Sequence, residues 1–196
     1  MNPEFAPLRL AVVGHTNTGK TSLLRTLTRD THFGEVRNSP GTTRHVEGVR
    51  LRLSSNELIE LFDTPGMEDS MALFDYLQRL ALEHDGMDPP QYIERFLQAP
   101  EAQERFEQEA RVLRQLLHSD VALYVVDVRD PVLAKHKDEL KILVMAGKPI
   151  LPVLNFTRSP DQRIDEWRAA LAALGLHALA EFDTVAPALN GEAQLY

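Results

Sequence analysis

Short apolar runs alternate with amphipathic segments along most of the chain. The runs at residues 8–13, 121–128 and 149–154 are of strand length and show no polar alternation, which is typical of strands buried on both faces of a sheet. Segments with helical periodicity lie near residues 20–27, 134–145 and 164–174, and a weaker last strand is expected at 178–182. Because helices connect buried parallel strands, the pattern predicts an α/β fold of three layers, with a mostly parallel sheet.

One pair of strands departs from the parallel pattern. From Val46 to Leu53 apolar residues alternate with arginines, which indicates a strand with one exposed face. The polar residues 54–56 are typical of a turn, and the apolar run 58–62 follows them directly. We therefore expect a hairpin, which makes one strand of the sheet antiparallel.

Residues 70–118 do not fit the minimal alternation. Their composition is helical, and prolines at 89–90 and at Pro100 interrupt it, so we expect two or three helices inserted in a domain that spans residues 1–190. The residues expected to pack inward are Phe106, Val112, Leu113 and Leu116, and those expected on a solvated face are Arg105, Glu109, Arg111 and Gln115. We interpret the insertion as a lid or spacer; the alternative is a surface that binds a protein partner.

The composition narrows the function classes. The chain has 196 residues, of which 43% are hydrophobic and 26% charged, values typical of one globular domain. It has no cysteine, which excludes disulfides, thiolate zinc sites and cysteine nucleophiles. The formal charge of −8 argues against direct nucleic-acid binding by this segment. We see neither a signal peptide nor a transmembrane segment, and expect a cytoplasmic protein.

Residues 14–21 read Gly-His-Thr-Asn-Thr-Gly-Lys-Thr and match the phosphate-loop pattern G-x-x-x-x-G-K-[ST], the Walker A sequence. The loop follows an apolar strand and precedes a helix, so its backbone N–H groups can surround a phosphate at the positive end of the helix dipole. Lys20 is expected to reach the β- and γ-phosphates and to be catalytic, and Thr21 to hold Mg²⁺. The residues expected to bind nucleotide here are Gly14, His15, Asn17, Thr18, Gly19, Lys20, Thr21 and Ser22.

A second element follows the strand at 58–62. It reads Asp63-Thr64-Pro65-Gly66, and an acid at this place can bind Mg²⁺ while the Gly66 N–H contacts a γ-phosphate. Between the two elements lies a loop at 38–45 that contains two adjacent threonines. One of them can complete the Mg²⁺ shell, although by itself the loop reads as an ordinary surface segment.

Together these three elements resemble the GTPases of the Era/TrmE group, within the translation-factor-related class of P-loop GTPases. The resemblance covers nearly the whole chain and is strongest to proteobacterial GTPases that carry a C-terminal domain of unknown function. It implies that residues 191–196 begin a linker to such a domain. It also implies that Thr43 is the switch threonine that binds Mg²⁺, and that Asp63 and Gly66 form the second switch.

The resemblance implies a further role for Asn17. In relatives such as TrmE, an asparagine at this loop position helps to hold K⁺ beside the phosphates, where the cation stabilises developing negative charge. By this resemblance Asn17 is a K⁺ ligand. The alternative is an asparagine that only tolerates a tight turn.

Two positions depart from better-known GTPases. Ras-like enzymes place a glutamine after the second switch glycine to orient water, whereas this chain has Met67, as the Era/TrmE group commonly has an apolar residue. We therefore expect slow intrinsic turnover. After the strand at 149–154 the family has Asn-Lys-x-Asp, whereas this chain reads Asn155-Phe156-Thr157-Arg158.

The second departure concerns recognition of the base. Asn155 matches the family, but Arg158 stands where a carboxylate would accept from guanine N1–H and the 2-amino group. Such a contact discriminates by about 1–3 kcal/mol, by analogy with duplex readout. Phe156 can still cover a purine by stacking, and Asp161 lies close enough in sequence to be a substitute acid. We list Asn155 and Phe156 as nucleotide-binding and leave the choice between GTP and ATP open.

Several polar residues near the predicted site have simpler interpretations. The side chain of His15 is expected at the surface, and Asp127 and Asp130 are expected to form a structural turn. Glu68 and Asp69 follow the second switch, where acids can position water but are more often solvated.

The sequence therefore predicts a Mg²⁺-dependent nucleoside triphosphatase that prefers GTP and acts as a slow conformational switch. Its catalytic residues are Lys20, Thr43 and Gly66, its Mg²⁺ ligands are Thr21, Thr43 and Asp63, and its ligands are GTP and GDP. One alternative is a binding module gated by nucleotide with negligible hydrolysis. Another is an ATPase, because the guanine motif is degraded.

Overall fold

The computed structural model describes residues 6–29, 47–52 and 57–184 and contains a six-stranded sheet in the order β2-β3-β1-β4-β5-β6. The strands are β1 (Leu8–Val13), β2 (Glu47–Arg52), β3 (Leu58–Asp63), β4 (Val121–Asp127), β5 (Ile150–Asn155) and β6 (Ala180–Glu181). Strand β2 pairs with β3 antiparallel, and every other pairing is parallel. The predicted α/β class with one antiparallel strand is confirmed.

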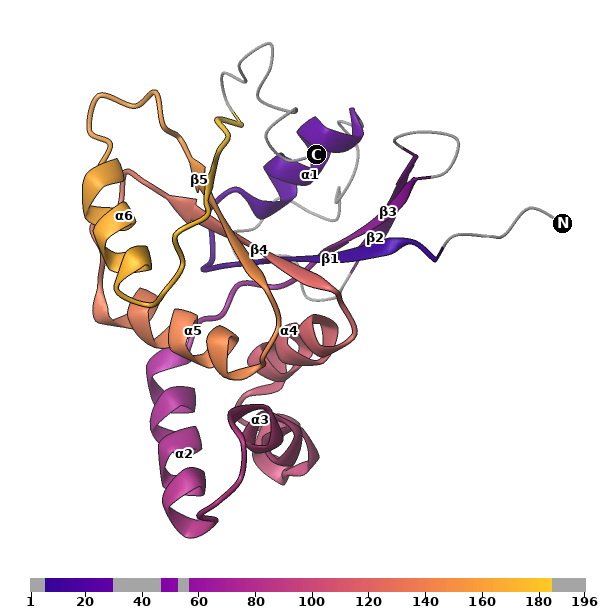
Figure 1. The fold of residues 1–196 in the computed structure, drawn as a ribbon, viewed down its shortest axis with the longest axis vertical. Helices are drawn as coiled ribbons and strands as arrows, with labels where there is room; N and C mark the ends of the chain where they lie inside the picture. Colours follow the sequence, from indigo (N-terminus) through magenta and orange to yellow (C-terminus); the bar gives the residue numbers. More distant parts are fainter. Residues whose placement is uncertain (1–5, 30–46, 53–56, 185–196) are drawn as a thin grey trace, which may run out of the picture.

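Helices cover both faces of the sheet (Figure 1). They are α1 (Lys20–Thr28), α2 (Ser70–Glu83), α3 (Pro89–Gln98), α4 (Glu107–Leu117), α5 (Ala134–Met145) and α6 (Ile164–Ala172), with a 3₁₀ turn at Pro100–Ala102. Helix α1 packs its leucines on one face of the sheet, and α4, α5 and α6 pack on the other. This gives the three predicted layers.

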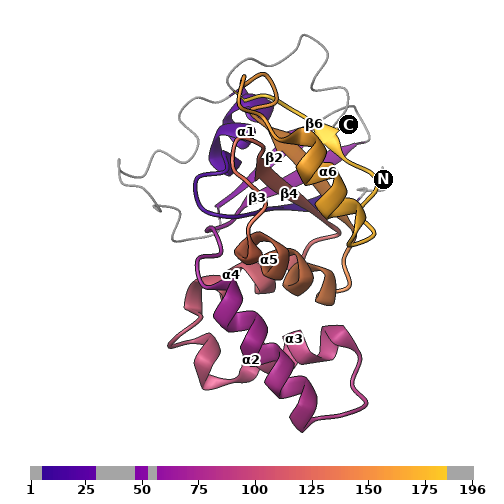
Figure 2. The ribbon, with the colours of Figure 1, turned by 90° about the vertical axis from the view of Figure 1, so that its left-hand side faces the viewer.

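The segment 70–118 adds to one side of this sandwich. In both views α4 and α5 lie between the sheet and the pair α2 and α3 (Figures 1 and 2). Phe106, Val112, Leu113 and Leu116 are fully buried in the larger of the two cores, as the sequence predicted. The segment forms three α-helices and the 3₁₀ turn, also as predicted.

The predicted hairpin is present as the antiparallel pair β2 and β3. The register of β2 and β3 runs from Glu47 opposite Asp63 to Arg52 opposite Leu58. The turn expected at 54–56, the switch loop with Thr43 and the linker expected at 191–196 lie outside the described residues. Within the described ranges, no helix is both long and apolar enough to cross a bilayer.

Candidate nucleotide-binding site

The candidate site lies at the edge of the sheet where the parallel strands end. Strand β1 runs into the phosphate loop, β3 ends in Asp63, β4 in Asp127 and β5 in Asn155. The register places Asp63 beside Val12 and Asp127 beside Asn155. Because these strands are parallel, residues far apart in the sequence meet at one edge, where α/β proteins bind ligands.

Residues 14–20 curl into a loop around the lysine. Asn17 and Gly19 have positive φ angles of 67° and 92°, and helix α1 begins directly afterwards at Lys20. The Lys20 Nζ donates to the carbonyl oxygens of Gly14 and His15 at 2.9 and 2.7 Å. Lys20 is 7% exposed, and burial lowers its pKa, while the carboxylates of Asp63 and Glu139 act in the opposite direction.

The two predicted Mg²⁺ ligands within the described residues contact each other. The Thr21 hydroxyl donates to Asp63 Oδ2 at 2.6 Å, and Asp63 is buried at the end of β3. A hydroxyl and a carboxylate are hard oxygen donors of the kind that Mg²⁺ prefers. This donor set fits Mg²⁺ beside the lysine.

The second switch lies directly against the phosphate loop. A Cβ atom on Gly66 would come within 2.5 to 2.7 Å of atoms of Thr16, so only glycine permits this approach. The next residue, Met67, pairs with His15 in a parallel bridge, and its side chain is fully buried in the core. Met67 therefore lies in the protein interior and offers no group to a water molecule at the loop.

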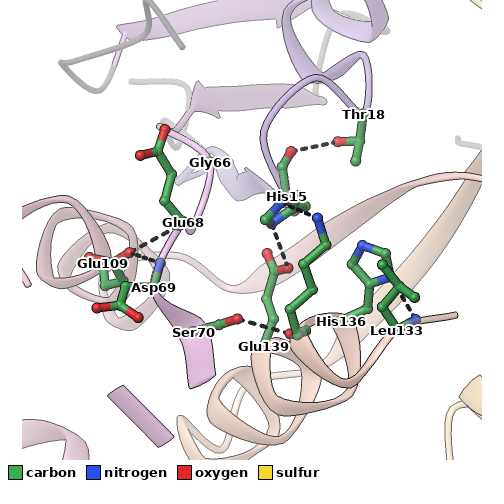
Figure 3. A network of polar contacts seen from close by, with 12 residues as sticks. His15, Thr18, Gly66, Glu68, Asp69, Ser70, Glu109, Leu133, His136 and Glu139 are labelled. Atoms are coloured by element: carbon green, nitrogen blue, oxygen red, sulfur yellow. Dashed lines mark hydrogen bonds and ion pairs between the residues drawn. The ribbon is translucent and has the colours of Figure 1, made fainter. Parts of the chain in front are cut away.

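Helix α4 holds the switch from its other side, which the sequence did not predict. The Gln108 Nε2 donates to the Gly66 carbonyl oxygen. The Glu109 Oε1 accepts from the backbone N–H groups of Glu68 and Asp69 at 3.0 and 2.9 Å (Figure 3). The expectation that Glu109 lies on a solvated face is wrong, because it is 3% exposed. Its partners are backbone amides that no residue pattern identifies.

A second buried polar group lies beneath the phosphate loop. The His15 side chain points toward Glu139 on α5 (Figure 3). From the same helix, Lys135 Nζ donates to His15 Nε2 at 2.8 Å. The expected surface position of this side chain is wrong, because it is 16% exposed. Glu139, also on α5, is completely buried, with its Oε2 3.8 Å from His15 Nδ1 and 3.5 Å from the Tyr124 hydroxyl.

Burial changes the acid–base properties of this group. Desolvation raises the pKa of Glu139 to about 8, against the effect of the nearby Lys20. Desolvation likewise lowers the pKa of His136 to about 4. Among the described residues, Glu139 Oε1 has no hydrogen-bond partner. Helical periodicity places position 139 on a helix face but does not show which charged side chain is buried there.

On the other side of the loop, Asn155 connects three segments. It is fully buried, and its Nδ2 donates to the carbonyl oxygen of Thr18 at 3.0 Å. Its Oδ1 accepts from the N–H groups of Phe156 and Thr184 at 2.9 and 3.0 Å. These bonds fix the phosphate loop to the segment that follows β6.

The residues after Asn155 form an unusual arrangement. The Phe156 ring lies 3.8 Å from the guanidinium carbon of Arg129, in a cation–π contact. Asp127 accepts from Arg129 Nε and Nη2 at 2.9 and 2.6 Å, bonds that raise the pKa of the guanidinium. It also accepts from the Arg129 backbone N–H, so the predicted turn at Asp127 is confirmed. The sequence did not identify Arg129.

Arg158 is exposed, as is the predicted substitute Asp161. The Arg158 backbone N–H donates to Asp183 Oδ2 at 3.0 Å, and Asp183 is 7% exposed. At the sequence position where the resemblance leads us to expect a base-binding carboxylate, the structure thus has an exposed arginine. Recognition of the base by Asn155, Phe156 or Asp161 stays a prediction.

The match to a family model agrees with this geometry. Residues 9–156 match the family described as 50S ribosome-binding GTPase. Among curated proteins, GTPase Der of Klebsiella pneumoniae is 21% identical over 165 residues, which is 84% of this chain and 28% of that protein. The chain spans less than a third of the length of the first curated relatives it matches.

Solved structures show the same fold. The structure of Era with MgGDPNP and nucleotides 1506–1542 of 16S ribosomal RNA has a TM-score of 0.67 at 18% identity and covers 95% of this chain and 54% of that one. The G domain of FeoB from T. maritima has a TM-score of 0.53 at 20% identity, with 97% and 94% covered.

Proposed function

The chain belongs to the family described as 50S ribosome-binding GTPase, and from this membership we propose that it binds GTP with Mg²⁺ and hydrolyses it slowly as a conformational switch. The observation that carries the proposal is the convergence of Lys20, Thr21 and Asp63 at the end of β1. In that place Lys20 Nζ donates to two backbone carbonyl oxygens of the phosphate loop, and the Thr21 hydroxyl donates to the Asp63 carboxylate.

Each residue has a defined role in the proposed reaction. The N–H groups of residues 14–22 surround the phosphates, and Lys20 leaves its two carbonyl partners to bind the β- and γ-phosphates. Thr21, Asp63 and Thr43 hold Mg²⁺, which supplies positive charge against the phosphate oxygens. The Gly66 N–H binds the γ-phosphate. After hydrolysis the released phosphate no longer holds Gly66, so the second switch is free to move.

Slow turnover follows from the surroundings of the attacking water. The side chain of Met67 is buried, so this position orients no water molecule. We propose that Asn17, which is exposed at the rim of the loop with φ 67°, binds K⁺ there. The cation would add its positive charge beside the phosphates to that of Lys20.

We place the protein in the cytoplasm and propose that helices α2 to α4 transmit the nucleotide state to a protein partner or to a C-terminal domain. The hydrogen bonds of α4 to Gly66, Glu68 and Asp69 support this proposal, because they connect the second switch to these helices. That these 196 residues do not themselves bind nucleic acid stays a prediction from their formal charge of −8.

Single-turnover hydrolysis of GTP in KCl and in NaCl tests the proposal. We expect a slow rate that KCl increases, and no measurable GTP binding by Lys20→Ala, a loss of at least about 100-fold (~2.7 kcal/mol). The exposed Lys137, on α5, provides the control variant Lys137→Ala. GTP binding without turnover in either salt would favour the nucleotide-gated binding module, and undiminished GTP affinity in Lys20→Ala would contradict the site itself.

A further inference from the structure

We infer that Glu109 is a positioning residue for the GTPase reaction: through the backbone of the second switch it holds Gly66 where its N–H can bind the γ-phosphate. This inference rests on the proposed function. It concerns a side chain on α4, in the segment between β3 and β4, that makes no contact of its own with the phosphate loop among the hydrogen bonds of the described residues.

The switch segment is enclosed between two rigid elements. On one side, Gly66 lies against Thr16 and Met67 pairs with His15, so the phosphate loop limits movement in that direction. On the other side, Gln108 of α4 bonds to the Gly66 carbonyl oxygen, and Glu109 accepts from the N–H groups of Glu68 and Asp69. The short stretch 66–69 is thus held from both sides by contacts within the protein.

The position of the Glu109 carboxylate is specific. Its Oε1 accepts two N–H groups that directly precede α2, which begins at Ser70, and negative charge is favourable at the start of a helix. Figure 3 shows the carboxylate beside Asp69 at this helix start. One oxygen therefore satisfies two amides that the helix itself cannot satisfy.

The Glu109 side chain is buried among apolar residues, where a glutamate needs a reason to be present. Glu109 is 3% exposed, and the residues near it on α4, Ala110, Val112 and Leu113, are fully buried and apolar. A charged carboxylate in such surroundings is unfavourable unless it is hydrogen-bonded. An apolar side chain would fill the same place without that cost, so the two amide bonds are what a glutamate provides here.

Holding Gly66 in place should affect only the binding of nucleotides that have a γ-phosphate. A segment that is already fixed loses little entropy when Gly66 binds the ligand, and preorganised donors stabilise developing charge best. Loss of the carboxylate leaves two amides without their acceptor and the segment free to move. Because GDP lacks the γ-phosphate that Gly66 contacts, the effect should appear with GTP and not with GDP.

The test compares the affinities of Glu109→Ala, Glu109→Gln and Glu107→Ala for GDP and for a non-hydrolysable GTP analogue. We expect Glu109→Ala to weaken analogue binding about tenfold, or ~1.4 kcal/mol, with GDP affinity changed by less than about twofold. Glu109→Gln keeps an oxygen that can accept both amides, so it should restore most of the affinity. The control Glu107 lies on the same helix, exposed and paired with Arg111.

Hydrogen exchange of the Glu68 and Asp69 amides without nucleotide gives a second readout. Exchange should be faster in Glu109→Ala and nearly unchanged in Glu109→Gln and Glu107→Ala. If Glu109→Ala fails to fold, Glu109→Met, which fills the same space without an acceptor for the two amides, provides the same comparison. An equal loss of GDP and analogue affinity, or no loss of either, overturns the inference, whereas a wild-type protein that binds neither nucleotide overturns the proposed function instead.

Discussion

The two sides of the candidate site differ in how closely they follow the pattern of P-loop GTPases. On the phosphate side, every described residue expected to bind phosphate or Mg²⁺ lies at one sheet edge, and Thr21 contacts Asp63. On the base side, only Asn155 follows the pattern, while Phe156 stacks under Arg129 and Arg158 replaces a carboxylate. The comparison teaches that phosphate binding depends on backbone geometry fixed by a local motif, whereas base selection depends on individual side chains.

Asn155 joins the two sides, because it bonds to Thr18 in the phosphate loop and to Thr184 beyond β6. It also explains why Gly19 must be glycine: a Cβ there would lie 2.4 Å from Asn155 Nδ2, at a φ angle of 92° that side chains rarely adopt. The difference between the two sides can therefore be tested first at the residue they share.

The largest effect is expected for Asn155→Ala. It removes three hydrogen bonds of a fully buried side chain and leaves their partners unsatisfied. We expect the free energy of unfolding to fall by about 2–3 kcal/mol. Because the phosphate loop loses its support, we also expect GTP and GDP affinity to fall by more than about tenfold.

Chemical denaturation and nucleotide titration measure these two changes. Asn155→Asp keeps the oxygen that accepts from Phe156 and Thr184 but sets a buried carboxylate oxygen against the Thr18 carbonyl, so it should lose nucleotide affinity and at least as much stability as Asn155→Ala. The partly exposed Thr157 gives the control Thr157→Ala. Unchanged nucleotide affinity in Asn155→Ala would show that the two sides are independent.

An intermediate effect is expected from Arg158→Asp. With arginine at this position no carboxylate meets the 2-amino group of guanine, so the wild-type protein should bind GTP and ITP within about threefold of each other. Restoring the carboxylate should favour GTP over ITP by about tenfold, which corresponds to ~1.4 kcal/mol. Competition titration with the two nucleotides measures the ratio.

Asp161→Asn tests the alternative that Asp161 replaces the missing carboxylate. If Asp161 is the substitute acid, the wild-type protein will already prefer GTP over ITP, and Asp161→Asn will abolish that preference. That result would contradict the view that the base side has lost guanine recognition, and it would leave the phosphate side unaffected.

The smallest effect concerns pH and tests the phosphate side. The pKa of Glu139 is raised from 4.5 to about 8, so the folded protein keeps a proton that the unfolded chain releases as the pH rises through this range. The free energy of unfolding therefore falls as the pH rises from 4.5 to 8 because of Glu139. In Glu139→Gln this side chain does not ionise, so that decrease is absent. We expect the melting temperature of Glu139→Gln, relative to wild type, to rise by about 2–4 °C between pH 6.5 and 8.

Thermal unfolding between pH 6.5 and 8 measures this difference. His15 and His136 are present in both proteins, so their protonation largely cancels in the difference between Glu139→Gln and wild type. Glu104→Gln, at an exposed position, should show no such change with pH. A difference in melting temperature that stays constant across this range would contradict the prediction, because it would mean that Glu139 is ionised throughout and stabilised by Lys20.

The prediction from sequence was accurate where a pattern is local. The strand at 58–62, the helix at 134–145 and the inward residues Val112 and Leu113 all appear as predicted. It was wrong for Glu109 and His15, which were both assigned to the surface without knowledge of the helices packed against them. It identified neither Arg129 nor Glu139 as part of the site.

The sequence by itself determined the order of strands and helices and the phosphate loop, because periodicity and a continuous run of eight residues act over short distances along the chain. Only the tertiary structure decided which polar side chains are buried against the loop. Glu109 meets the switch across 41 residues and Asn155 meets Thr18 across 137, and contacts at such separations depend on how the sheet and its helices pack. Charged residues that serve these contacts look, in sequence, like any residue of a solvated helix face.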